Sequence, residues 1–154
     1  MDPSQFEAQK DTSLAHQIIK AGRLINARGL ATLREAFGLP ALKQSHLDLL
    51  PHIDFAGTPI TEIARRKGVS KQLVSKQVAE MVAMGLLHTR TDPADNRSKR
   101  VFFHTSGPAS IERGFGVLLG LDHLLANALG KREYDTMVAG ITRVVALFGG
   151  AEEV

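Results

Sequence analysis

Between residues 58 and 105 the chain has the pattern of two short helices followed by a charged hairpin, and few folds accept that order. The first helix is expected over residues 58–67 and ends at Gly68, which can adopt the left-handed conformation of a helix cap. The second helix is expected over residues 70–84. Two short helices joined by about three residues that include a glycine predict a helix–turn–helix.

Cap residues support these boundaries. Thr58 is expected to be the N-cap of the first helix, with Pro59 at its first helical position, where the missing N–H costs nothing. Ser70 is the expected N-cap of the second helix, and Gly85 ends that helix.

Two β-like runs follow, over residues 86–91 and 100–105. The residues between them, 92–99, are turn formers and charged residues that cannot bury themselves, so they predict a hairpin with a protruding tip. Together these elements predict a winged helix–turn–helix, which is a mainly α fold with a small β-hairpin wing.

At 100° per residue, the second helix separates an apolar face from a small polar face. The apolar face holds Val74, Val78, Met81 and Val82. The polar face holds Gln72, Ser75, Lys76 and Ala79, with Lys71 and Ser70 near the entry. These residue types suit base edges, since glutamine pairs with adenine, lysine pairs with guanine and an alanine methyl contacts thymine. The alternative is an amphipathic surface helix whose polar residues are simply solvated.

The net charge of +3 hides an uneven distribution. Residues 60–105 hold nine bases and four acids, a net charge of +5, whereas the rest of the chain carries −2. Clustered positive charge is what a polyanion-binding surface needs, although a solvated basic face has the same composition. The bases expected to contact phosphates are Arg65, Arg66, Lys71, Lys76, Lys99 and Arg100.

Arg97 lies among turn residues at the expected hairpin tip. An arginine on a projecting loop can enter a minor groove, where the negative potential is concentrated. Asp95 stands two residues away and is expected to brace Arg97 or a helix arginine, which would fix the wing. The competing interpretation is a plain surface ion pair.

Long helical patterns flank this segment. The expected helices cover residues 11–37, 41–52, 107–129 and 131–148. The third would be roughly 34 Å long at 1.5 Å per residue, too long for a small body to bury alone. Its apolar positions exceed what one helix–turn–helix can cover, which favours a homodimer. The alternative is that these helices close the core of a monomer.

Several kinds of chemistry lack the residues they need. The 154 residues include no cysteine, which excludes disulfides, thiolate metal sites and thiol nucleophiles. No glycine-rich phosphate loop, GxSxG motif or HExxH motif is present, so the sequence predicts no enzyme and no cofactor. Six histidines suggest zinc, but none forms an HxxxH or HxxE unit, so no metal site is predicted. With no export signal and no apolar span, a cytoplasmic protein that joins the nucleoid through DNA is expected.

Three motifs connect the chain to a known family. The second helix closes with Met84-Gly85-Leu86-Leu87, the wing reads Asp92-Pro93-Ala94-Asp95-Asn96-Arg97, and the next helix starts at Thr105-Ser106-Gly107. In this combination the chain resembles the MarR family of bacterial regulators, most specifically over residues 58–107. Asn96 departs from the family pattern, because a second arginine is common there, and His104 stands where leucine is usual.

The resemblance implies a homodimer that binds a pseudo-palindromic operator in double-stranded DNA, most often as a repressor. Residues 1–154 would then form a single domain. Within it, residues 11–55 would support the fold and dimerise, residues 56–106 would form the winged helix–turn–helix, and residues 107–150 would dimerise.

Many members of this family release DNA when a small aromatic or phenolic anion enters a pocket between the dimer helices and the DNA-binding lobe. The candidate residues for such a pocket are His16, Lys20, Arg23 and His46. Solvent-facing or core-edge polar residues would have the same sequence pattern. One other class of function also stays open, a winged helix that binds a protein partner or acts as an anti-repressor without binding an operator.

Overall fold

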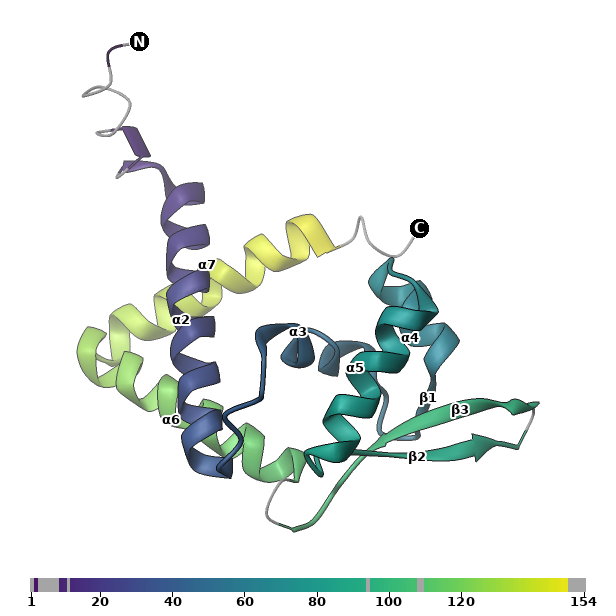
Figure 1. Ribbon diagram of the computed structural model, residues 1–154. Coiled ribbons are helices and arrows are strands. Elements are labelled where there is room, and N and C mark those ends of the chain that lie inside the picture. The colour runs from purple at the N-terminus through teal and green to yellow at the C-terminus, as the bar shows by residue number, and fades with distance from the viewer. Residues whose placement is uncertain (1, 3–8, 11, 94, 108–109, 150–154) are drawn as a thin grey trace. The chain divides into compact units, whose positions relative to one another are not determined.

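The computed structural model describes residues 2, 9–10, 12–93, 95–107 and 110–149 (Figure 1). The elements are α2 (Leu14–Phe37), α3 (Gln44–Leu47), the 3-10 helix η1 (Leu50–His52), β1 (Thr58–Pro59), α4 (Ile60–Lys67), α5 (Lys71–Ala83), β2 (Leu87–Asp92), β3 (Asp95–Phe103), α6 (Ile111–Leu129) and α7 (Lys131–Gly149). The strands form one antiparallel sheet in the order β1-β3-β2. The predicted fold class, mainly α with a small β wing, is confirmed.

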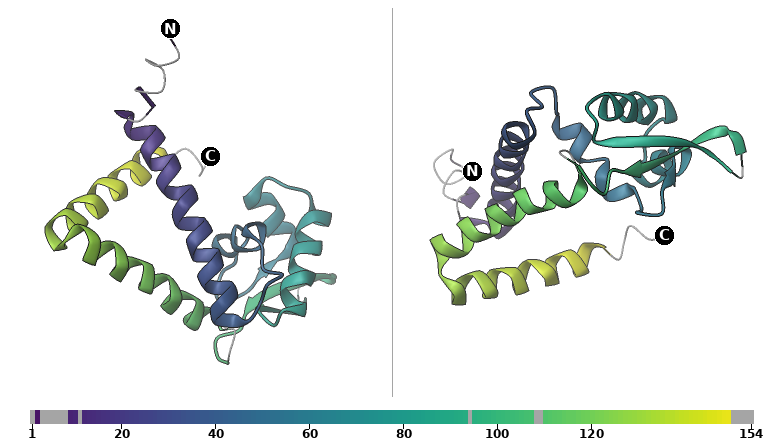
Figure 2. Two further views of the ribbon diagram at one scale, coloured as in Figure 1. Left: turned by 60° about the vertical axis from the view of Figure 1, so that its left-hand side comes forward. Right: turned by 90° about the horizontal axis from the view of Figure 1, so that it is seen from below.

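Contacts divide the chain into two compact units, Met1–Val117 and Leu118–Val154. The first unit contains the helix–turn–helix α4–α5 and the hairpin β2–β3, which projects beyond the two helices (Figure 2). No described helix is long and apolar enough to cross a membrane.

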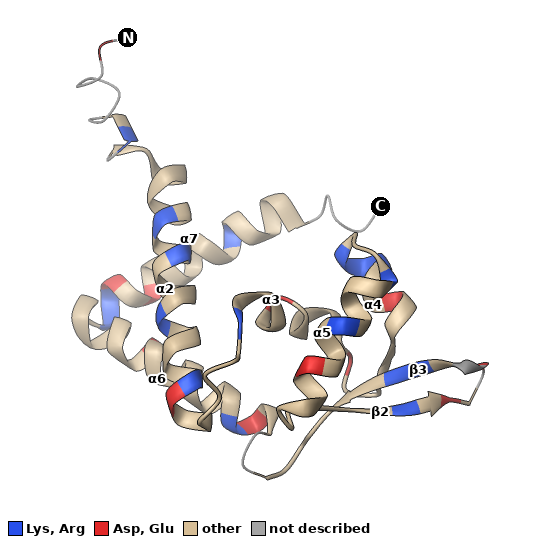
Figure 3. Ribbon diagram, viewed as in Figure 1, with Lys and Arg blue, Asp and Glu red and all other residues tan. Residues whose placement is uncertain are grey.

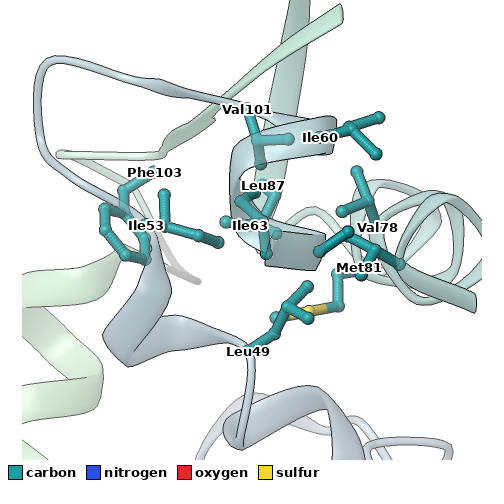
Figure 4. Close-up of a cluster of buried hydrophobic side chains, with 11 residues drawn as sticks. Leu49, Ile53, Ile60, Ile63, Val78, Met81, Leu87, Val101 and Phe103 are labelled. Carbon is teal, nitrogen blue, oxygen red and sulfur yellow. The ribbon is translucent and has the colours of Figure 1, made fainter. Parts of the chain in front are cut away.

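One apolar cluster holds α4, α5 and the sheet together (Figure 4). Ile63 of α4, Met81 of α5 and Val101 of β3 are fully buried within it. Leu49 and Ile53, which flank η1, close the cluster from the preceding segment. Burial of such side chains is the main favourable contribution to folding, so this cluster fixes how α5 lies against the wing.

The turn between α4 and α5 follows the predicted pattern. Gly68 adopts a left-handed φ of 68°, and its N–H donates to carbonyls of the last turn of α4. The Ser70 hydroxyl accepts from the Leu73 N–H, as an N-cap should. Gly85, with φ of 74°, follows the end of α5.

The expected N-cap at Thr58 is wrong. Thr58 and Pro59 form the strand β1, which pairs with Val101 and Arg100 of β3, and Pro59 rather than Thr58 precedes the first helical residue. The Thr58 hydroxyl accepts from the Asp54 N–H at 2.8 Å and donates to the Asp54 carboxylate at 3.2 Å. The threonine therefore stabilises the turn before the strand instead of the helix.

Other predicted boundaries also shift. The expected helix over residues 41–52 consists of the four-residue α3 and η1, which are separate. The expected wing loop over residues 92–99 is shorter, because β2 continues to Asp92 and β3 begins at Asp95. The described part of the helix predicted to begin at residue 107 starts at Ile111.

The first expected helix starts at Leu14, after the N-cap Ser13, whose hydroxyl accepts from the His16 N–H. The earlier start predicted at residue 11 lies outside the described residues. The two C-terminal helices match their predicted ends closely, since α6 stops before Gly130 and α7 runs to Gly149.

Candidate nucleic-acid interface

The outward face of α5 carries the polar residues that the sequence assigned to it. Lys71, Gln72, Lys76 and Ala79 are exposed, and Ser75 is half-buried. Val74, Val78 and Met81 point into the core, as predicted, but Val82 remains 38% exposed. Val82 therefore lies at the edge of the apolar face instead of within it.

Basic residues surround this face. Lysine and arginine occur on α4, on α5 and on both strands of the hairpin (Figure 3). Within the wing, Lys99 is exposed on β3 opposite Thr91, and Arg90 is exposed on β2 opposite Arg100. The first unit thus presents a small hydrogen-bonding face beside a cationic hairpin.

The two arginines at the end of α4 share one carboxylate. Arg65 donates from Nε and Nη2 to Glu62 at 2.8 and 2.7 Å, and Arg66 donates from Nε to the same carboxylate at 2.8 Å. The hydrogen bonds from Arg65 and then Arg66 lower the pKa of Glu62 to about 2. Arg66 also pairs with Asp54 at 3.0 Å. The carboxylates hold both guanidinium groups in fixed orientations and offset part of their charge.

Arg100, predicted to contact phosphate, is engaged inside the wing. Its Nη1 donates to the Gly57 carbonyl at 2.8 Å, and its Nε lies 3.5 Å from Oδ2 of Asp92. The Asp92 side chain is only 8% exposed, and the Arg100 side chain is 32% exposed. Arg100 therefore joins the turn before β1 to both strands of the hairpin. The sequence analysis missed Asp92 as its partner, because the pairing depends on the register of β2 and β3.

The tip of the wing holds the remaining predicted residues. Asp95 begins β3 and stands opposite Asp92 in the strand register. Arg97 also lies on β3, but its side chain is outside what the structure describes, so its predicted role stays a prediction.

The outer face of the hairpin carries a stack of rings. The His88 ring stacks on Phe102 with centroids 5.4 Å apart, and the His104 ring lies 4.9 Å from His88. Arg90 sits over the Phe102 ring at 5.4 Å. Burial, together with the nearby His104 and Arg90, lowers the pKa of His88 below its usual value.

A second group of polar residues joins α3 to α5, and the sequence analysis did not predict this grouping, although it named His46 as a candidate pocket residue. His46 is buried, and its Nε2 lies 2.7 Å from Oε2 of Glu80. Lys43 donates from Nζ to the same carboxylate at 3.1 Å. Gln77 donates from Nε2 to the Ser45 carbonyl at 3.2 Å. The hydrogen bonds from His46 and then Lys43 lower the pKa of Glu80.

Comparison with known proteins shows which families have a similar sequence and fold. A MarR family model matches residues 37–98, which contain α3, α4, α5 and most of the wing. Residues 37–98 are therefore similar to the MarR family. Among curated proteins, no significant sequence relative was found.

Solved MarR-type structures share the fold over most of the chain. MepR, a transcription regulator of the multidrug efflux pump MepA from Staphylococcus aureus, has a TM-score of 0.66 at 16% identity, covering 87% of this chain and 97% of MepR. MarR from E. coli has a TM-score of 0.62 at 19% identity, covering 86% and 96%. The transcriptional repressor CouR, bound to a 23-mer DNA duplex, has a TM-score of 0.63 at 19% identity, covering 89% and 95%.

The four residues expected to line a MarR-type ligand pocket fall into two environments. His16, Lys20 and Arg23 are exposed on α2, and the His16 ring lies 3.2 Å from the Ser13 hydroxyl. His46 is 1% exposed and is hydrogen-bonded within the first unit, so it shares no open site with the other three.

An open cavity of about 550 Å³ lies elsewhere in the first unit, lined by Phe55, Thr105, Ile111, Glu112 and Phe115. None of the four candidate residues of the MarR-type ligand pocket lines it. In the described part of the chain, no three histidine, aspartate or glutamate side chains are grouped to hold a metal ion.

Proposed function

We propose that this chain is a DNA-binding transcription regulator of the MarR family, acting in the cytoplasm as a homodimeric repressor on a pseudo-palindromic operator. The observation that carries the proposal is the outward face of α5, where Lys71, Gln72 and Lys76 are exposed beside the basic hairpin. Residues of these types, on a helix that can enter a major groove, suit direct contact with base edges. MepR and CouR have both been solved in complex with DNA, which agrees with this use of the fold.

The proposed contacts divide by residue type. Gln72, Ser75 and Lys76 would read bases, while Lys71 and Lys99 would bind phosphates. The Ser70 hydroxyl already accepts from the Leu73 N–H as the N-cap of α5. Ser70 is therefore proposed to contact DNA through its backbone N–H, or through the hydroxyl while it still caps the helix. Arg97 is proposed to enter the minor groove.

The arginines that carry internal partners receive narrower roles. Arg65 is 74% exposed, so it and Arg66 are proposed to meet phosphate while Glu62 holds them in place. Arg100 is proposed to act by bracing the wing, because its guanidinium binds the Gly57 carbonyl and lies beside Asp92. Asp95 is proposed to stabilise the tip from which Arg97 extends.

A homodimer is the proposed state because α6 and α7, both fully described, contain no buried residue. On α7, Met137, Val138, Ile141 and Val145 are 39–63% exposed at helical spacing. A contiguous apolar stripe of this kind favours burial against a partner. A two-fold dimer would place the two α5 helices in successive major grooves, about one helical turn of DNA apart.

We also propose that a small aromatic anion relieves repression. His16, Lys20 and Arg23 lie within two turns of α2 and offer exposed cationic or hydrogen-bonding groups. His46 is left out of this site because both of its ring nitrogens are within hydrogen-bonding distance of internal partners.

The deciding experiment measures binding to DNA from the region upstream of its own gene at about 50 and 200 mM salt. Several phosphate contacts should reduce the affinity at least about tenfold over this range. Lys76→Ala should weaken operator binding more than binding to random DNA, since Lys76 is proposed to read bases. Lys131→Ala is the matched control, because Lys131 is an exposed lysine of α7 that pairs only locally, with Asp135.

Absence of salt-sensitive binding to any DNA would favour the alternative, a winged helix that binds a protein partner. Arg97→Ala tests the wing separately. It should weaken operator binding while circular dichroism and the dimer stay unchanged, and equal affinity would remove Arg97 from the proposed interface.

A further inference from the structure

The recognition helix α5 is held on one side by the apolar core and on another by α3. The second contact is polar and partly buried. His46, at the centre of α3, is 1% exposed and reaches Glu80 on α5 at 2.7 Å. An ion pair between exposed side chains would contribute little, but the buried imidazole makes this contact well ordered.

The hydrogen bonds of His46 fix which ring nitrogen carries the proton. The Lys43 backbone N–H donates to Nδ1 at 3.2 Å, so Nδ1 acts as an acceptor. Nε2 then carries the hydrogen and donates it to the Glu80 carboxylate. The His46 imidazole thus connects the backbone at the start of α3 to Glu80 in the C-terminal half of α5.

Gln77 provides a second connection one turn away. Its Nε2 donates to the Ser45 carbonyl at 3.2 Å, and the residue is only 7% exposed. Residues three apart on a helix lie on the same face, so Gln77 and Glu80 both face α3 and each forms a hydrogen bond with it. Two contacts at different heights on one face oppose rotation of α5 about its own axis.

We propose that His46 and Glu80 are positioning residues for DNA recognition, whose hydrogen bond holds α5 at the rotation in which Gln72 and Lys76 meet base edges. The inference rests on the proposed function. It gives a role to Glu80, a carboxylate on the helix proposed to bind DNA. Its charge alone would disfavour DNA binding, because it repels phosphate. Base readout depends on the direction of short side chains, whereas long flexible lysines tolerate rotation when they bind phosphate.

Electrostatics and positioning predict opposite results for Glu80. If Glu80 only repels phosphate, then Glu80→Ala and Glu80→Gln both strengthen binding to every DNA. If Glu80 positions α5, Glu80→Ala weakens operator binding, and Glu80→Gln restores it because the amide oxygen still accepts from Nε2–H.

The experiment compares the dissociation constants of full-length variants for an operator duplex and for a random duplex of equal length, at one salt concentration. Glu80→Ala should lose about tenfold in operator affinity with little change on random DNA. Glu80→Gln should stay within about threefold of wild type. His46→Phe should match Glu80→Ala, and the double variant should be no weaker than either single one, because both remove the same contact.

Gln44→Ala is the matched control on α3, since the Gln44 side chain donates to Asp48 on the same segment and not to Glu80. Should Glu80→Ala fail to fold, Gln77→Met carries the same expectation. It removes the donor to the Ser45 carbonyl while keeping the length of the side chain.

Stronger binding by both Glu80 variants, or equal losses on operator and random DNA, would overturn the positioning role. In either case wild-type binding would remain salt-sensitive, so the proposed function would stand. Wild-type protein that binds no DNA at all would overturn both proposals together.

Discussion

The winged helix and the C-terminal helices differ in how far their apolar side chains are buried. In the winged helix, Ile63, Val74, Met81 and Val101 are fully buried against one another. In α6 and α7, helices of 19 residues each, no residue is buried. The apolar residues of the winged helix thus have their partners within that segment, whereas α7 leaves Met137, Val138, Ile141 and Val145 exposed.

The largest expected effect comes from the core of the winged helix. Ile63→Ala should lower the free energy of unfolding by about 2–5 kcal/mol, because it removes a fully buried side chain and leaves a cavity. Denaturant unfolding at two protein concentrations checks this. If the loss changed with concentration, the core would depend on a partner and the contrast between the regions would fail.

The second prediction concerns α7. Ile141→Gln should weaken self-association by about 10- to 100-fold, the equivalent of exposing one large apolar side chain. Arg143→Gln is the control, since it introduces the same residue on the opposite face of the helix. Sedimentation equilibrium measures both, and equal dimer constants would show that the exposed stripe of α7 has another use.

Two glycines provide the third comparison. Gly57 and Gly130 both have left-handed φ angles, 86° and 78°, but a Cβ at Gly57 would overlap the Phe102 ring, while a Cβ at Gly130 meets nothing within 4 Å. Both alanine variants incur backbone strain, and only Gly57→Ala also crowds a neighbour. Gly57→Ala should therefore cost about 1–3 kcal/mol more in unfolding free energy than Gly130→Ala. Equal costs would mean that the Phe102 ring moves aside freely.

The smallest expected effect is a pH dependence of the wing. The folded state lowers the pKa of His88 below its usual value of about 6.5, mainly by burial. The unfolded chain therefore binds the proton more readily than the folded one. The stability of the fold with neutral His88 is fully present above pH 6.5, and the free energy of unfolding decreases as the pH falls below that value. The difference in denaturation midpoint between about pH 7.5 and pH 5.5 should shrink in His88→Gln. An unchanged difference would assign the pH dependence to other groups.

Patterns contained within one or two helical turns were predicted well from the sequence. Gly68 and Ser70 are read from local rules, because a left-handed cap and a hydroxyl N-cap involve neighbours within about four residues. The inward and outward faces of α5 follow from helical geometry alone, apart from Val82 at the boundary.

Features that depend on distant pairing were not predicted. Thr58 has the composition of an N-cap, but its strand partner Val101 lies more than forty residues away in the sequence. The contacts of Arg100 and His46 also depend on tertiary pairing, since Asp92 is brought close to Arg100 by the strand register and Glu80 to His46 by the packing of α3 on α5. From residue types alone, Arg100 is predicted to contact phosphate and His46 to line a pocket, but the sequence does not reveal the internal partners that both side chains have.

The short strand β1 has a consequence for solubility. It lies at one edge of the three-stranded sheet, and exposed edges invite pairing with strands of other molecules. β1 is only two residues long, and one of them, Pro59, has no N–H to offer. That edge is therefore a poor template for intermolecular strand addition, because it offers another molecule few backbone groups with which to pair.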